Sequence, residues 1–103
     1  MLRPMGVLDL AQVTELIQEL QGWTLEGAAI RRTFAFADFP AALAFAVNVG
    51  VRAEAADHHP DITISYKKVT LTYSTHSEGG LTPKDFEGAK AADAAFGMAD
   101  GRW

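Results

Sequence analysis

Residues 62–73 read Ile-Thr-Ile-Ser-Tyr-Lys-Lys-Val-Thr-Leu-Thr-Tyr, and the architecture of the chain follows from them. Ile62–Tyr66 alternates strictly between apolar and polar side chains, and so does Val69–Tyr73. Alternation of this kind is typical of a strand that buries one face. The break at Lys67-Lys68 therefore predicts a tight turn between two antiparallel strands. Lysine is not a preferred residue of a two-residue turn, so the turn type stays open.

A second pair of strands is expected upstream. Residues 23–26 are short and extended, and residues 30–37 alternate, with apolar side chains on one face and Arg32 as the exception on that face. This pattern again indicates a sheet with one apolar side. Trp23 could form a wall for a planar ligand or be an aromatic residue of the core next to a turn, and the second interpretation is favoured.

A helix is expected at each end of the chain. Asp9 and Gln12 have the spacing of a capping box at the start of the first helix, residues 9–20. The last helix begins within residues 81–85, Leu-Thr-Pro-Lys-Asp. There the threonine caps the helix, the proline is its first residue, and Asp85 is at the third position.

A long helix over residues 39–56 begins after the capping residue Asp38. Its apolar residues form two stripes, whereas a helix that covers one sheet needs only one. The second stripe indicates burial against another helix, in the same chain or in a second subunit. One stripe comprises Phe39, Leu43, Val47 and Val51, and the second comprises Ala42, Phe45, Val49 and Ala56.

The element order is thus α-β-β-α-β-β-α, which predicts an α+β fold: a four-stranded antiparallel sheet with helices packed on one face. A length of 103 residues fits a single domain, residues 1–103, and we expect less order at its ends, residues 1–8 and 98–103. The chain lacks cysteine, a signal-peptide pattern and any apolar run of about 18 residues. These features favour a cytoplasmic protein, and a formal net charge of -4 argues against nucleic-acid binding.

Chemistry is expected at residues 54–60, Glu-Ala-Ala-Asp-His-His-Pro. His58 and His59 stand at the expected end of the long helix, because Pro60 disfavours helix for the residue before it. His76 lies in a second loop, which ends in two glycines. An unperturbed histidine titrates near pH 6.5 and can exchange a proton at neutral pH. If the fold brings the two loops together, three imidazoles line one pocket.

Other interpretations compete with proton transfer. Three histidines and a carboxylate could bind zinc, but no HxH or HExxH spacing is present. Ser74 and Ser77 lie near His76 without the context of a nucleophilic triad. Asp85 has a complete structural explanation in the capping box, and it could also orient His76. Glu54 and Asp57 either orient the histidines, bind N–H groups of a ligand ring, or belong to a solvated helix end. Among these interpretations, general acid–base catalysis by the histidines is favoured.

The ordered set Asp57-His58-His59-Pro60, Tyr66, Ser74-Thr75-His76, Gly80-Leu81-Thr82 and Asp85 resembles the signature of the pterin-4a-carbinolamine dehydratases. The resemblance covers residues 22–92. It implies the same α+β fold and a reaction in which 4a-hydroxytetrahydropterin loses water to give quinonoid dihydropterin. One departure is Ile62, at a position where family members often carry an aromatic residue.

The resemblance also implies roles for individual residues. His58 and His59 are the acid–base pair, His76 binds and polarises the pterin, and Asp85 supports the site. No metal or cofactor is required. The residues that the resemblance places around the substrate are Glu54, Asp57, Pro60, Ser74, Thr75 and Ser77.

The implied partners are a pterin and further copies of the chain, as a homodimer or homotetramer, with a functional link to an aromatic amino-acid hydroxylase. Animal relatives also act as dimerisation cofactors of a transcription factor through the long helix. A non-catalytic binding module that uses residues 39–56 is therefore the alternative function. Self-assembly is preferred, because nothing in the sequence specifies a foreign partner.

Overall fold

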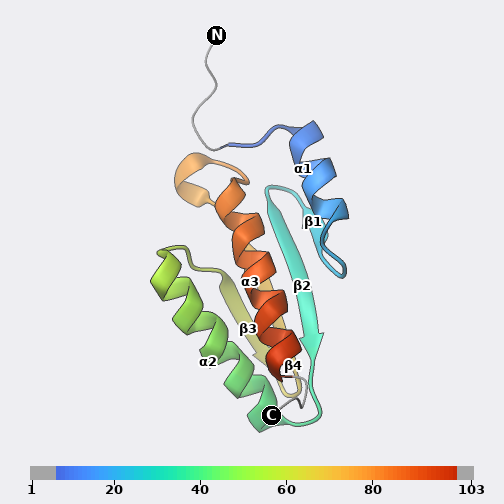
Figure 1. Cartoon of the computed structure of the whole chain (residues 1–103), viewed down its shortest axis with the longest axis vertical. Coiled ribbons are helices and arrows are strands. Elements are labelled where there is room, and N and C mark those ends of the chain that lie inside the picture. The colour runs from blue at the N-terminus through green and yellow to red at the C-terminus, as the bar shows by residue number, and fades with distance from the viewer. Residues whose placement is uncertain (1–6, 100–103) are drawn as a thin grey trace.

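A four-stranded antiparallel sheet forms the centre of the computed structural model, which describes residues 7–99 (Figure 1). Each strand pairs antiparallel with its neighbours, in the order β1-β2-β4-β3. The hairpin predicted from residues 62–73 is therefore present, with β4 inside the sheet and β3 at its edge. The strands are β1 (Thr24–Glu26), β2 (Ala29–Ala35), β3 (Asp61–Ser65) and β4 (Lys68–Tyr73).

Two long helices, α2 (Phe39–Ala56) and α3 (Pro83–Ala99), pack side by side over one face of this sheet (Figure 1). The shorter α1 (Leu10–Gln18) lies by the end of the sheet that carries β1, and a 3₁₀ turn, η1 (His76–Glu78), follows β4. The predicted order α-β-β-α-β-β-α is thus confirmed. Among residues 7–99, no helix has the length and apolar character needed to cross a membrane.

The core lies between the sheet and the two long helices. Phe34 of β2 and Leu71 of β4 are at most 1% exposed, and both contribute to the face that the helices cover. The α3 face that meets the sheet is built of small residues, so this helix approaches closely. A Cβ added at Gly88 would stand 2.5 Å from Cε1 of Tyr73. The buried apolar side chains of α3 are Phe86, Ala89, Ala92 and Ala95.

The starts of the helices follow the sequence more closely than their ends do. Asp9 Oδ1 accepts the backbone N–H of Gln12, and Gln12 Oε1 accepts that of Asp9, which completes the predicted capping box. However, α1 ends at Gln18 and not at residue 20. The chain then turns through Gly22, whose φ of +88° suits glycine.

The hairpin turn also differs by one residue from the prediction. It comprises Tyr66 and Lys67, because Ser65 pairs with Lys68, which is already the first residue of β4. Tyr66 adopts a φ of +54° there. A positive φ is uncommon for a bulky residue, which is why the local sequence did not indicate this turn.

Arg32 and Trp23 share one partner on α3. Asp93 Oδ1 accepts a hydrogen bond from Arg32 Nη1 at 2.7 Å and another from Trp23 Nε1 at 3.0 Å. The Arg32 guanidinium also lies 4.2 Å from the ring centroid of Phe34. Arg32, the charged exception on the apolar face of the strand, is therefore neutralised by Asp93. Trp23 is only 5% exposed and belongs to the core, as favoured above.

The two stripes of α2 have different environments. Val49, at 2% exposed, belongs to the stripe that packs into the core of the same chain, together with Ala42 and Phe45. The same-chain explanation therefore holds for these three members of the second stripe, and Val49 is not on an assembly surface. Ala56, its last predicted member, is exposed. The stripe left at the surface comprises Phe39, Leu43, Val47 and Val51, which are between 39% and 66% exposed.

The expectation of less ordered ends falls mostly outside the described residues, which exclude 1–6 and 100–103. Within them, the backbone N–H of Leu8 donates to the carbonyl of Leu81 at 2.8 Å. This bond joins the segment before α1 to the segment before α3.

Candidate active site

The histidine pair begins where α2 ends. Asp57 adopts the left-handed conformation with a φ of +53°, and the backbone N–H of His58 donates to the carbonyl of Ala53. This hydrogen bond is typical of a helix that ends in a left-handed turn. The turn directs His58 inward, with a side chain 13% exposed, and leaves His59 outside with 56%. Pro60 is half-buried and leads directly into β3.

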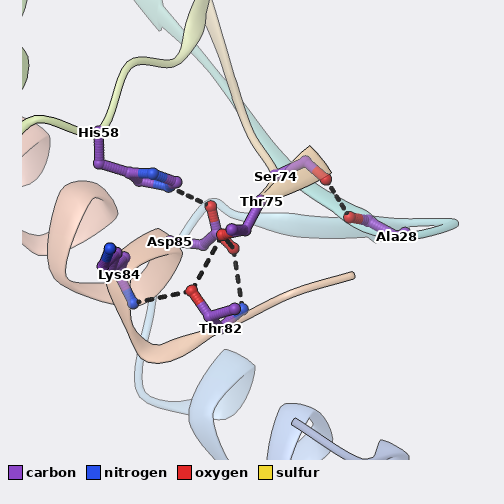
Figure 2. Close-up of polar contacts among 7 residues, drawn as sticks. All are labelled: Ala28, His58, Ser74, Thr75, Thr82, Lys84 and Asp85. Atoms are coloured by element: carbon purple, nitrogen blue, oxygen red, sulfur yellow. Dashed lines mark hydrogen bonds and ion pairs between the residues drawn. The ribbon is translucent and has the colours of Figure 1, made fainter. Parts of the chain in front are cut away.

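A buried carboxylate, Asp85, connects the two predicted loops (Figure 2). Its Oδ1 lies 2.6 Å from Nε2 of His58, and its Oδ2 accepts the hydroxyl of Thr75 at 2.8 Å. The same Oδ2 accepts the backbone N–H of Thr82 at 2.9 Å. Asp85 is 0% exposed, and a buried carboxylate needs such partners. Its predicted capping position is thus confirmed, and the imidazole it contacts is His58 rather than His76.

The tautomer of His58 follows from this arrangement. A carboxylate that already accepts two other hydrogen bonds also accepts at Oδ1, so the neutral imidazole of His58 carries its proton on Nε2. Nδ1 then has a free lone pair. This ring nitrogen is the one available to take a proton from another molecule.

Tyr73 packs against His58 from the sheet side. Their rings are stacked, with centroids 6.1 Å apart and an interplanar angle of 23°. Burial, followed by the nearby charges of Asp85 and Asp93, raises the pKa of Tyr73 to about 12. The phenol therefore stays neutral at physiological pH, and Tyr73 serves as a flat wall that fixes the His58 ring.

His59 forms a separate pair with Glu54 at the surface. Nε2 of His59 lies 2.8 Å from Oε1 of Glu54, and both side chains are more than half exposed. Glu54 therefore orients His59, which was one of the roles considered for it from the sequence. Asp57, at the turn between them, is exposed as well.

The second loop borders a hollow of about 320 Å³ on the sheet side of the site. Ser74 contributes a hydroxyl that donates to the carbonyl of Ala28 at 2.7 Å, which ties this loop to the turn between β1 and β2. Ser77 is exposed within η1. The residues that line the hollow are Ala28, Ala29, Asp61, Thr72, Ser74, His76, Gly79 and Gly80.

His58 lines a different and smaller cavity of about 100 Å³ between α2 and α3, beside Tyr73 and Gly88. Neither of these two cavities is lined by all three imidazoles. His58 faces this cavity, His76 faces the larger hollow, and His59 turns to Glu54. The loops themselves do meet, because Asp85 contacts both His58 and Thr75.

Sequence reasoning missed two residues of the larger hollow, Asp61 and Thr72. They are direct partners across β3 and β4, so their side chains share one face. The strand register was the signal that could have placed them together. Ile62 lies opposite Leu71 and thus on the other, helix-covered face. Within residues 7–99, no cluster of three or more His, Cys, Asp or Glu side chains could hold a metal.

Comparisons with known proteins identify the family of this chain. The family described as pterin 4 alpha carbinolamine dehydratase matches residues 7–95. A protein from Roseiflexus castenholzii, provisionally named pterin-4-alpha-carbinolamine dehydratase, is 53% identical over 88 residues, covering 85% of this chain and 95% of that protein. One of the same name from Chloroflexus aurantiacus is 49% identical over 90 residues, covering 87% of this chain and 97% of its own.

Solved structures show the same fold. The crystal structure of a transcriptional coactivator/pterin dehydratase from Brucella melitensis aligns with a TM-score of 0.82 at 36% identity, covering 86% of this chain and 97% of that one. A pterin dehydratase-like protein, identified as a RuBisCO assembly factor of the alpha-carboxysome, has a TM-score of 0.60 at 21% identity and covers 73% of this chain and 87% of its own. The second likeness concerns the fold alone. From the family match and these relatives, the chain belongs to the pterin 4 alpha carbinolamine dehydratase family.

Proposed function

We propose that this protein removes water from 4a-hydroxytetrahydropterin and releases quinonoid dihydropterin. The observation that carries the proposal is the His58–Asp85 pair, in which a fully buried carboxylate fixes an imidazole at the junction of two loops. Membership of the family supports the substrate class. The physiological link that we propose is recycling of the pterin cofactor of an aromatic amino-acid hydroxylase.

The elimination needs two proton transfers. The C4a–O bond breaks as the hydroxyl leaves with an added proton as water, and N5–H of the pterin gives up its proton to form the C4a=N5 double bond. His58 and His59 both contact a carboxylate through Nε2, so each exchanges a proton with the substrate through Nδ1. A positioned acid or base of this kind contributes about 10²–10⁴-fold.

The His58–Asp85 pair is buried and the His59–Glu54 pair is exposed, and this difference suits the two proton transfers of the reaction. The buried pair keeps His58 in one orientation, whereas the exposed ring of His59 exchanges its proton with solvent between turnovers. In the proposal, His76, Ser74 and Thr75 contribute to binding of the pterin.

Rapid-mixing absorbance tests this function. The 4a-hydroxytetrahydropterin is generated in situ, and its decay is followed with wild type, His58→Ala and His59→Ala. We expect dehydration far above the spontaneous rate in wild type, and a loss of about 10²-fold or more in each variant. Absence of acceleration by folded wild-type protein would rule out the dehydratase.

A second candidate function, association through α2, is favoured by the exposed apolar stripe that includes Val47 and Val51, each about two-thirds exposed. The name of the Brucella relative includes a coactivator role for that protein. We infer self-assembly as the simpler use of this stripe. Light scattering on Val47→Glu tests it: a lower mass than wild type supports assembly through the stripe, and an unchanged mass refutes it.

A further inference from the structure

The hollow of about 320 Å³ is distinct from the cavity beside His58, and its polar lining has no use in the proton transfers above. Its volume is at the low end of the range of about 300–1,000 Å³ that is usual for small-molecule sites. Asp61 and Thr72 line it from the sheet, and Ser74 and His76 line it from the loop. The hollow therefore combines one carboxylate, two hydroxyls and one imidazole.

Asp61 is the charged group of this hollow. It is the first residue of the edge strand β3, and it is exposed. Across residues 7–99, its carboxylate has neither a hydrogen-bond donor nor a cation as partner. Ser74, by contrast, has its hydroxyl proton committed to the carbonyl of Ala28, so its oxygen can only accept further hydrogen bonds. Two acceptors with open lone pairs thus face the hollow.

We propose that Asp61 binds the pyrimidine edge of the pterin, by accepting parallel hydrogen bonds from N3–H and the 2-amino group. This inference rests on the proposed function and specifies which edge of the substrate is held. N3–H and the 2-amino group are adjacent donors in one plane, as in a guanidinium, and a carboxylate accepts such a pair in bidentate geometry. The bonds are charge-assisted, which makes them stronger than those of a neutral acceptor.

The position of the reacting carbon supports this orientation. C4a is directly across the pyrimidine ring from C2, so a carboxylate at the C2 side leaves C4a at the opposite side. Asp61 follows the histidine pair by two residues and is joined to it through half-buried Pro60. In the proposal the ring extends from the hollow toward His58 and His59, so that holding its far edge sets the distance between C4a and these acid–base groups. Asp61 is a substrate-binding residue in this proposal and takes no part in proton transfer.

The test uses Asp61→Asn, with Glu15→Gln as a control that removes one exposed carboxylate of α1. An asparagine can offer one acceptor and one donor, so it cannot accept both bonds. We expect KM for the 4a-hydroxytetrahydropterin to rise by about 10–100-fold, the loss that corresponds to a hydrogen bond with a charged group. kcat changes by less than about threefold, since the acid–base residues are intact, and Glu15→Gln matches wild type.

A binding titration separates this inference from the dehydratase function. Stable 7,8-dihydropterin and its counterpart without the 2-amino group are titrated into wild type and Asp61→Asn by calorimetry. We expect wild type to bind the complete pterin more tightly by about tenfold or more, and the variant to bind both alike. This preference would support the inference even if wild type failed to accelerate dehydration.

Two results would overturn the role of Asp61. One is an Asp61→Asn protein with the wild-type KM and the wild-type preference for the 2-amino group, in which case Asp61 is merely a charge on an edge strand. The other is a wild type that does not distinguish the two pterins. Either result leaves the dehydratase proposal standing if wild type is active.

Discussion

Replacing Asp85 with asparagine keeps the shape of this side chain and changes what it offers to His58. Oδ2 of Asp85 accepts from Thr75 and from the backbone of Thr82, so the amide oxygen of the asparagine must take this position. The amide nitrogen then replaces Oδ1, 2.6 Å from Nε2 of His58. Because an amide nitrogen only donates, Nε2 must become the acceptor and the proton of neutral His58 moves to Nδ1. The free ring nitrogen is then no longer a base.

The two expected effects of Asp85→Asn have different sizes. Loss of the base function should lower kcat by about 10²–10⁴-fold. For stability, all three hydrogen bonds lose a charged partner: Thr75 and the Thr82 backbone donate to a neutral amide oxygen, and His58 accepts from the neutral amide nitrogen. Each is weakened by about 1 kcal/mol, so the free energy of unfolding falls by at most about 3 kcal/mol. A domain with about 5–15 kcal/mol of stability should therefore still fold.

Urea unfolding and rapid-mixing absorbance measure these effects separately, and Asp93→Asn is the matched control. Asp93 is on the same helix and accepts hydrogen bonds from Trp23 and Arg32, away from the histidines. We expect Asp93→Asn to lose a comparable free energy of unfolding and to keep the wild-type kcat. A folded Asp85→Asn protein with wild-type kcat would refute the reasoning, and so would an equal loss of kcat in both variants.

Two further predictions concern Tyr73 and its neighbour on α3. The pKa of Tyr73 is raised to about 12 in the folded protein, above the value of about 10 for an unfolded chain, so the folded state holds this proton more tightly. The resulting stability is complete below pH 10 and is lost between about pH 10 and pH 12, by about 3 kcal/mol, in urea titrations. Tyr73→Phe should lack this loss. If its free energy of unfolding fell equally between pH 10 and pH 12, Tyr73 would not be the group responsible. Gly88→Ala should destabilise by about 1–3 kcal/mol in the same assay, because its Cβ would stand 2.5 Å from the Tyr73 ring. Gly50→Ala, on α2 with no atom within 4 Å of the added Cβ, should instead stabilise by about 0.5–1 kcal/mol, and equal effects at both glycines would contradict this contact.

Sequence patterns predicted the elements of this fold because their causes are local. Alternation in residues 62–73 and the capping box at Asp9 depend on neighbours within a few residues, and both are confirmed. The exact turn was wrong because register depends on which residues pair. Ser65 opposite Lys68 places Tyr66 in the turn, although its own conformational preference opposes this.

The candidate site could be predicted only in part, because its contacts depend on packing between elements. His76 was considered as a possible partner of Asp85, whereas the position of α3 against the end of α2 brings Asp85 to His58. Similarly, Val47 and Val49 belong to stripes of similar hydrophobicity, and only the presence of α3 decides which stripe is buried. Asp61 was not predicted because its place beside Thr72 in the hollow depends on the register with β4.

The structural and chemical explanations of Asp85 are not alternatives, because the same three hydrogen bonds provide both. The bond from the Thr82 backbone starts α3, the bond from Thr75 fixes the end of β4, and the bond from His58 fixes the segment after α2. A serine or threonine could satisfy a helix start, but its shorter side chain could not contact all three elements. The carboxylate therefore couples formation of the first turn of α3 to the orientation of the imidazole. It follows that the imidazole of His58 is held in this orientation only when the ends of these three elements have come together.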